Sequence, residues 1–187
     1  MNSYALLVRA ANTSGPAVDR LEALGARPAS VPHTWRLMTQ NADDAVAAAL
    51  LAARFPGMLA SIGAAHGTDG TSERFARDLA TGALVSLETH PARFPVGVAG
   101  ESSEAAVDAE AALRLVARIV AHRSEAEWRV VDLLTPGVRG QHKAVAEALG
   151  ISTQAVSKAL ARTGWQEELL GRGLAARLLR DAAGGPR

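Results

Sequence analysis

The chain has 187 residues, of which 48% are hydrophobic and 21% charged, so it can form one compact domain with a smaller second one and is not a disordered chain. Its formal net charge of +1 excludes a wholly basic nucleic-acid coat, although residues 1–121 carry 10 basic and 12 acidic side chains while residues 122–187 carry 10 and 7. The absence of cysteine excludes disulfides and thiolate metal sites. We therefore expect a cytoplasmic protein, with neither a signal peptide nor a membrane span.

The first hundred residues alternate between apolar runs typical of strands and capped segments typical of helices. Strands are expected at Tyr4–Val8, Trp35–Thr39, Met58–Ala64 and Phe94–Val98. Helices are expected to begin at Pro16, after Asn41 and at Ser72, with Val18, Leu21, Leu24, Phe75, Leu79 and Leu84 facing the core. This alternation predicts an α+β protein that begins with a small ferredoxin-like α/β sandwich of roughly four strands, with helices on one face, over residues 1–100.

From Ser103 onward the pattern is entirely helical. An apolar stripe runs along the first helix and predicts a linker and dimerisation helix over residues 101–123, with the stripe formed by Val107, Ala111, Leu115, Val116, Ile119 and Val120. Ser124 and Glu127 are spaced as a capping box for the next helix. A last helix is expected at Gln166–Leu179, with its apolar face at Leu169, Leu170, Leu174 and Leu178, followed by a frayed end at 184–187.

Residues 141–160, QHKAVAEALGISTQAVSKAL, predict a helix-turn-helix within a module spanning 124–187. Small Ala146 allows the two helices to approach closely, and Gly150 supplies the positive φ that the turn needs. Ser152 is a natural N-cap for the second helix. Helical hairpins with a glycine at the bend also occur in structural bundles, so the spacing alone does not establish DNA binding.

The polar face of the second helix favours a DNA-binding role. Donors and acceptors suited to base edges and phosphates fall on its outward side, and further cations flank it, which gives the expected contact set Arg139, Lys143, Ser152, Thr153, Gln154, Ser157, Lys158 and Arg162. Between residues 137 and 165 four basic side chains face a single acid, Glu147. A phosphate backbone would favour that imbalance.

Three segments carry a family resemblance. RVVDLL at 129–134 and KAVAEALGISTQAVSKAL at 143–160 resemble the C-terminal helix-turn-helix of SatD-like bacterial proteins, and more loosely those of MarR-type regulators and sigma factor region four. MLASIGAAHGTDGTSERFARDLATGAL at 58–84 is similar in layout to the nucleotide-cyclase-like domain of that family. The resemblance implies a cyclase-like domain followed by a DNA-binding module. Where cyclase-like domains hold metal-binding acids, this chain has Arg9-Ala10-Ala11 and Gln40-Asn41-Ala42, which indicates a degenerate domain.

Signals for catalysis or metal binding are weak. Gly63, Gly67 and Gly70 match neither the dinucleotide nor the phosphate-loop pattern and indicate turns. Asp43 and Asp44 are expected to be first-turn helix acids rather than metal ligands, and the five histidines lack zinc-binding spacing. His66 near Asp69 is the best candidate for holding a small ligand, yet the pair alone makes no hydrolytic site. Trp35, Trp128 and Trp165 are expected in the core.

These patterns together predict a transcriptional regulator, not an enzyme, that binds duplex DNA as a homodimer without cofactor or metal. The N-terminal unit is left with two roles, dimerisation or the sensing of a small-molecule or protein effector. The alternative is a protein that binds or processes a nucleotide and uses the helix-turn-helix for docking. The missing acidic pair argues against metal-dependent phosphate chemistry in that alternative.

Overall fold

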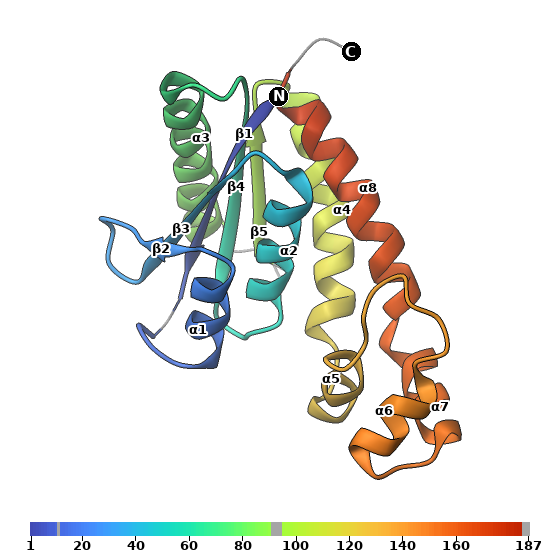
Figure 1. Cartoon of the computed structure of the whole chain (residues 1–187). Coiled ribbons are helices and arrows are strands. Elements are labelled where there is room, and N and C mark those ends of the chain that lie inside the picture. The colour runs from blue at the N-terminus through green and yellow to red at the C-terminus, as the bar shows by residue number, and fades with distance from the viewer. Residues whose placement is uncertain (11, 91–94, 185–187) are drawn as a thin grey trace.

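The computed structural model describes residues 1–10, 12–90 and 95–184, and its centre is a mixed five-stranded sheet (Figure 1). The strands lie in the order β2-β3-β1-β4-β5, and all neighbours are antiparallel except β4 and β5. Their bounds are β1 Asn2–Arg9, β2 Arg27–Pro28, β3 Thr34–Thr39, β4 Leu59–His66 and β5 Val96–Gly100. The α+β class and the four predicted strands are confirmed, apart from Phe94, which lies outside the described residues.

The edge strand β2 was not expected. It consists of Arg27 and Pro28, which pair with Arg36 and Trp35 of β3. A two-residue strand shows no alternation of apolar and polar positions, and a proline lacks the N–H that a central strand needs. The sequence therefore held no signal for it, and the sheet has five strands instead of roughly four. The ferredoxin-like arrangement is not confirmed.

The helices begin and end close to the predicted boundaries. Their bounds are α1 Pro16–Ala23, α2 Ala42–Ala53, α3 Gly70–Thr89, α4 Ser103–Ala121, α5 Glu125–Val131, α6 His142–Leu149, α7 Thr153–Thr163 and α8 Trp165–Ala182. Side-chain oxygens cap five of them, from Asn41, Asp69, Ser102, Ser124 and Ser152. Each cap satisfies a backbone N–H of the first turn that has no partner within the helix, which is why short polar residues fix these starts.

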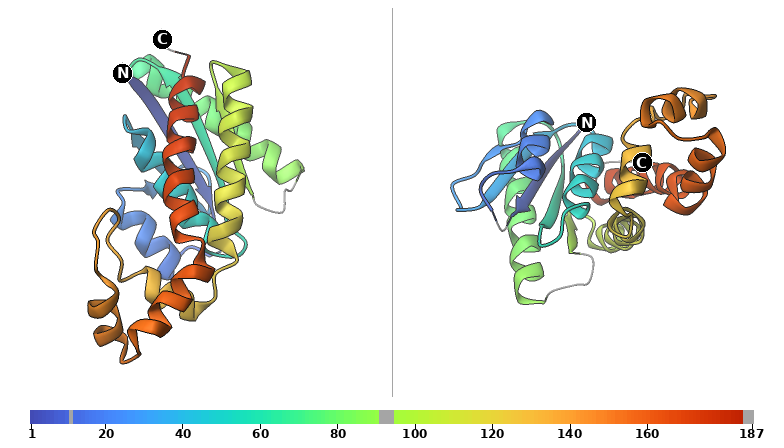
Figure 2. Two further views of the ribbon diagram at one scale, coloured as in Figure 1. Left: turned by 90° about the vertical axis from the view of Figure 1, so that its right-hand side faces the viewer. Right: turned by 90° about the horizontal axis from the view of Figure 1, so that it is seen from below.

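Helices cover both faces of the sheet, so the expectation of helices on one face was wrong (Figures 1 and 2). Alternate residues of β1 explain this: Ala5 and Leu7 are buried under α3 alone, whereas Tyr4, Leu6 and Val8 belong to the core shared with α1, α2, α4 and α8. A strand buried on both sides is continuously apolar instead of alternating. The smaller core under α3 is made largely of alanines, and it leaves Phe75, an expected core residue, 45% exposed.

Gly63 lies within β4 and allows α3 to approach the sheet. A Cβ placed on it would lie 1.9 Å from the carbonyl oxygen of Ala76. Ala76 and Ala80 on the facing side of α3 are completely buried. Close packing of helix on strand therefore explains this glycine, and it is not part of a loop as its spacing with Gly67 and Gly70 had indicated.

α8 returns from the far end of the molecule along α4, and the two lie side by side in both views (Figures 1 and 2). Glycines allow the contact, since a Cβ on Gly171 would lie 2.5 Å from Cγ2 of Val116 and one on Gly164 would lie 2.7 Å from Cγ2 of Ile119. The second half of α8 then enters the sheet core through Ala175, Ala176 and Leu179. The last helix thus packs on the N-terminal unit as well as on the helical module.

Several residues of the predicted apolar faces are exposed in the single chain. On α4, Val107 and Leu115 are each 68% exposed, while Val116 and Val120 of the same predicted stripe are buried. Leu170 and Leu174 of α8 are 78% and 42% exposed, and Leu24 after α1 is 47% exposed. The alanine-rich face of α4 faces the core instead, so these helices present leucine and valine to solvent. Of the expected frayed end at 184–187, residues 185–187 lie outside the described residues, and the N–H of Gly184 bonds the Asp181 carbonyl at 3.1 Å.

Candidate nucleic-acid interface

α5, α6 and α7 form a small unit at the end of the molecule opposite the start of β1 (Figure 1). Its own core consists of Val130, Val145, Ala146 and Val156, with Leu134, Leu149 and Leu160 packed around them. Gly150 has φ 65 in the left-handed region, and the N–H of Ile151 bonds the Ala146 carbonyl at 3.0 Å. The hydroxyl of Ser152 accepts from the N–H of Ala155 at 3.1 Å. The predicted roles of Ala146, Gly150 and Ser152 are therefore confirmed.

The structure places all of the expected contact residues on the surface. α7 faces the core with Val156 and Thr163 and presents its polar side chains outward, so that the exposed set is Ser152, Thr153, Gln154, Ser157, Lys158 and Arg162. Lys143 on α6 and Arg139 in the loop before it are also exposed. The capping bond uses one lone pair of the Ser152 oxygen, so the hydroxyl keeps its proton and a second lone pair for a partner.

The four cations of this surface differ in their ion pairing. Lys143 lies 4.0 Å from Glu147, and Arg162 lies 3.9 Å from Glu127 of α5; these distances are at the limit for an ion pair. Arg139 and Lys158 form no ion pair with any residue in the described ranges. Exposed pairs at such distances contribute little, so the surface keeps its positive charge.

Glu127 bonds Ser124 more closely than it bonds Arg162. This explains why its carboxylate neutralises the charge of Arg162 poorly. Its carboxylate accepts from the N–H of Ser124 at 2.9 Å and from the hydroxyl of the same residue at 3.0 Å. These bonds, with a smaller contribution from the charges of Arg162 and Arg123, hold the pKa of Glu127 below its usual value. The predicted capping box is confirmed.

Two neighbouring residues that the sequence did not single out organise this surface. The Gln141 side chain accepts from the N–H of Thr135 at 2.8 Å and donates to the carbonyls of Thr135 and Val138 at 2.8 and 2.9 Å. It thereby closes the loop that carries Arg139. Nδ1 of His142 lies 3.2 Å from Oγ of Ser157, which connects α6 to α7. Neither contact has a sequence signature, because both depend on how the loop folds back.

Beside α7 lies a hollow of about 700 Å³ between this loop and the start of α8. Arg139, His142, Ser157 and Gln166 contribute its polar walls, and Leu160 and Trp165 contribute apolar ones. It opens next to the polar face of α7.

The structure does not bring His66 and Asp69 together as a ligand site. Asp69 caps α3, accepting from the N–H and the hydroxyl of Ser72 at 2.8 Å each, and these bonds lower its pKa. The His66 ring instead lies 3.2 Å from the Asn2 side chain. Asp69 therefore serves as the N-cap of α3, a role that was not assigned to it from the sequence.

Arg9, and the acids Asp43 and Asp44 that were weighed as metal ligands, have partners within the chain. Arg9 at the end of β1 forms an ion pair with Glu88 of α3 at 2.6 Å. Asp43 pairs with Arg180 of α8 at 3.4 Å, and Asp44 accepts from the Thr39 hydroxyl at 3.3 Å. Within residues 1–10, 12–90 and 95–184, no three histidine or acidic side chains gather in a group that could hold a metal ion.

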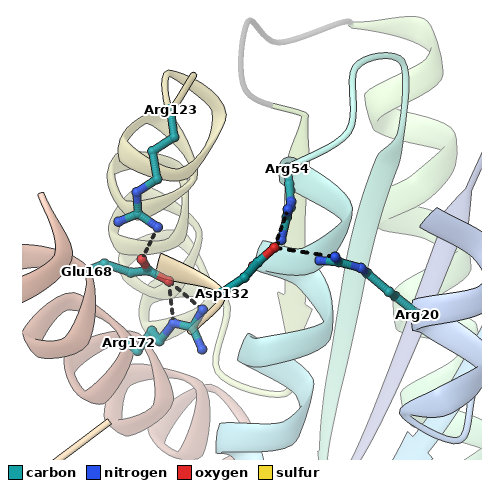
Figure 3. A network of polar contacts seen from close by, with 6 residues as sticks. All are labelled: Arg20, Arg54, Arg123, Asp132, Glu168 and Arg172. Carbon is teal, nitrogen blue, oxygen red and sulfur yellow. Dashed lines mark hydrogen bonds and ion pairs between the residues drawn. The ribbon is translucent and has the colours of Figure 1, made fainter. Parts of the chain in front are cut away.

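A polar joint connects the helical unit to the N-terminal unit (Figure 3). Arg54 of α2 bonds both oxygens of Asp132, directly after α5, at 2.7 and 2.8 Å, and Arg20 of α1 lies 3.4 Å from the same carboxylate. Burial would raise the pKa of Asp132, but the bonds and charges of Arg54 and Arg20 outweigh it and hold the pKa below its usual value. The guanidinium of Arg54 also lies 3.9 Å over the ring of Trp128.

The second half of the joint is buried. Glu168 of α8 is completely buried and lies 2.5 Å from Arg123, whose side chain is 1% exposed. Nε of Arg172 donates to the same carboxylate at 2.8 Å. The guanidinium of Arg123 lies 4.9 Å from the centre of the Trp128 ring, so this ring contacts two guanidinium groups, those of Arg54 and Arg123. No periodicity marks Arg123, Glu168 or Arg172 in the sequence, since they meet only when α8 returns.

Comparisons with protein-family models, with curated proteins and with solved structures found no match. The resemblance to SatD-like proteins over residues 58–165 therefore stays a prediction. No helix in the described part of the chain combines the length and apolar character needed to cross a bilayer.

Proposed function

We propose that the chain is a sequence-specific, duplex-DNA-binding transcriptional regulator whose α6 and α7 form a helix-turn-helix. The observation that carries the proposal is the outward face of α7, where exposed Gln154, Ser157 and Lys158 lie opposite the apolar side that packs on α5 and α6. The unpaired charges of Lys158 and Arg139 lie on this unit. A face of this kind fits the major groove, where side chains contact base edges while flanking cations contact phosphates.

Each residue of the face has a role that follows from its chemistry. Gln154 and Ser157 contact base edges, because amide and hydroxyl groups can donate and accept there. Lys158, Arg162, Arg139 and Lys143 contact phosphates, with Ser152 and Thr153 at the helix start alongside them. The ion pair of Arg162 with Glu127, 3.9 Å long, is weak enough to exchange for a phosphate.

The regulator acts as a homodimer in this proposal. A single helix-turn-helix contacts few base pairs, and dimers solve this by binding two half-sites about 34 Å apart on one face of the DNA. The outer faces of α4 and α8 are the surface for a second copy, because Leu115 and Leu170 are 68% and 78% exposed on two helices that pack together. Exposed large apolar side chains on adjacent elements are typical of such interfaces.

The salt dependence of DNA binding tests the proposal. A preferred duplex is first selected from a randomised library with the purified protein, and its affinity is then measured by fluorescence anisotropy across a salt series. Four phosphate contacts per protomer give a slope of about −3.6 in log K against log salt, or about −7 for a dimer. A flat slope, or equal affinity for RNA and duplex DNA, overturns the proposal.

Two variants with a matched control test the assignment of roles. Gln154→Ala relaxes the preference between the selected duplex and a scrambled one, whereas Lys158→Ala weakens binding to both alike and lowers the slope by about 1. Arg177→Ala removes an equally exposed charge from α8 and leaves binding within about twofold, since Arg177 lies in the half of α8 that packs on the sheet core. The opposite pattern for Gln154 and Lys158 means that α7 presents a different face.

A further inference from the structure

A groove of about 490 Å³ lies at the polar joint, between α1 and α2 on one side and α5 and α8 on the other. Its apolar walls include Leu24, Leu51, Val131 and Trp165. Leu24 is 47% exposed although its position in the α1 pattern had predicted burial. The volume is within the range of small-molecule sites, which often lie between packed units.

The charges of the groove do not balance. Its lining includes three arginines, Arg20, Arg54 and Arg172, and two acids, Asp132 and Glu168. Each acid already has a close partner, because Arg54 bonds Asp132 through two nitrogens and Arg123 pairs with Glu168 from behind the groove. The charges of Arg20 and Arg172 are therefore in excess, one on each wall.

Both arginines in excess keep N–H groups for a further partner. Among the described residues, Arg20 makes one contact of 3.4 Å, to Asp132, and its side chain is 44% exposed. Within the same residues the Arg172 side chain bonds Glu168 alone and is 35% exposed. A guanidinium offers five N–H donors, so neither is saturated by these bonds. A carboxylate is the anionic group that such a fork binds best with two parallel bonds.

We propose that this groove binds a small carboxylate with an apolar body. The carboxylate lies between Arg20 and Arg172, and the body covers Leu24, Leu51 and Trp165. Because the walls belong to the sheet-bound helices α1 and α2 and to the ends of α5 and α8, an occupant changes the contacts that set the position of the α5–α7 unit. The effect on DNA affinity rests on the proposed function, whereas the binding itself does not.

The test uses the full chain, three carboxylates and a neutral control. Hexanoate, octanoate and 2-naphthoate are titrated by isothermal calorimetry without DNA, and 2-naphthylmethanol serves as the uncharged match of 2-naphthoate. At least one carboxylate binds saturably at one per chain, and 2-naphthoate binds at least about 10-fold more tightly than the alcohol, as expected for charged hydrogen bonds. Absence of saturable binding for all three, or equal affinity for acid and alcohol, overturns the proposal.

Variants locate the site. Arg20→Gln and Arg172→Gln each weaken the best carboxylate at least about 10-fold, while Arg177→Gln on the same helix as Arg172 leaves its affinity unchanged. Leu24→Trp fills the groove from an exposed position and abolishes binding, with circular dichroism showing that the fold is retained. If all three groove variants bind the carboxylate with unchanged affinity, the assignment of its binding site to this groove is wrong.

The effect of the carboxylate on DNA binding is measured separately from the binding of the carboxylate itself. If the best carboxylate shifts the anisotropy curve of the selected duplex and this shift is lost in Arg172→Gln, the groove regulates DNA binding. If the chain binds no duplex but calorimetry still shows the carboxylate, the groove stands and the proposed function falls. If the duplex binds and no carboxylate does, the proposed function stands and the groove falls.

Discussion

The buried carboxylate of Glu168 provides the sharpest test of the joint. Glu168→Gln keeps the shape of the side chain but removes the charge that compensates Arg123, whose side chain is 1% exposed. Breaking a buried ion pair by removing one partner costs about 3–5 kcal/mol, because the other charge is left uncompensated. In a protein of this size each kcal/mol lowers the Tm by about 2–4 °C, so the expected loss is about 6–20 °C.

The assay is a thermal unfolding scan at neutral pH with a neighbour as control. Glu167 is exposed, and Glu167→Gln changes the Tm by no more than about 2 °C because exposed substitutions rarely exceed about 0.5 kcal/mol. The double variant Arg123→Met with Glu168→Met recovers most of the loss, since an apolar pair of similar volume needs no compensation. A Tm for Glu168→Gln within 2 °C of the parent, or a double variant as unstable as the single one, refutes the electrostatic argument.

Three further predictions concern packing, acid stability and assembly. Gly63→Ala lowers the free energy of unfolding, measured in urea, by about 1–3 kcal/mol, because the added Cβ would lie 1.9 Å from the Ala76 carbonyl oxygen. Gly70→Ala is the control and has a much smaller effect, because nothing lies within 4 Å of the added atom. The pKa values of Asp132, Glu127 and Asp69 are lowered in the folded protein, so these carboxylates stabilise it fully above the unfolded pKa of about 4, and that stability is lost as the pH falls through the folded pKa values. The urea concentration at the unfolding midpoint therefore drops below pH about 4, and Asp132→Asn reduces that drop. A midpoint that does not change with pH contradicts this prediction. Leu115→Glu combined with Leu170→Glu gives a monomer in light scattering that keeps the circular dichroism spectrum of the parent, since both side chains are exposed in the single chain; a monomeric parent at micromolar concentration contradicts the dimer.

The sequence predicted the features that are decided locally. The caps at Asn41, Ser124 and Ser152 and the left-handed Gly150 follow from the chemistry of one or two residues, and each is found in the structure. The strand positions could also be predicted, because continuous apolar runs such as Tyr4–Val8 have few other uses. The exposed face of α7 followed from helical spacing once the start at Ser152 was fixed.

Features that depend on long-range packing could not be predicted. Val116 and Val120 were assigned to the dimerisation stripe together with Val107 and Leu115, but they are buried within the chain, and only the return of α8 along α4 decides this. The Arg54–Asp132 pair joins residues 78 positions apart, so no spacing rule detects it. Gly63 was assigned to a loop because nothing in the local sequence indicates that a helix packs closely on a strand at this position.

The way the chain enters and leaves the α5–α7 unit determines how a signal can reach it. The chain enters through α4 and leaves through α8, and both helices are part of the core that contains the sheet. Gly164 and Gly171 bring the two helices into contact near the unit, so it cannot swing on a flexible linker. A shift of α5 against α1 and α2 would break the bonds of Arg54 and Arg20 to Asp132. If the proposed DNA binding is regulated through the N-terminal unit, we expect the signal to pass through this joint, because Asp132 follows α5 directly and bonds arginines from the ends of α1 and α2.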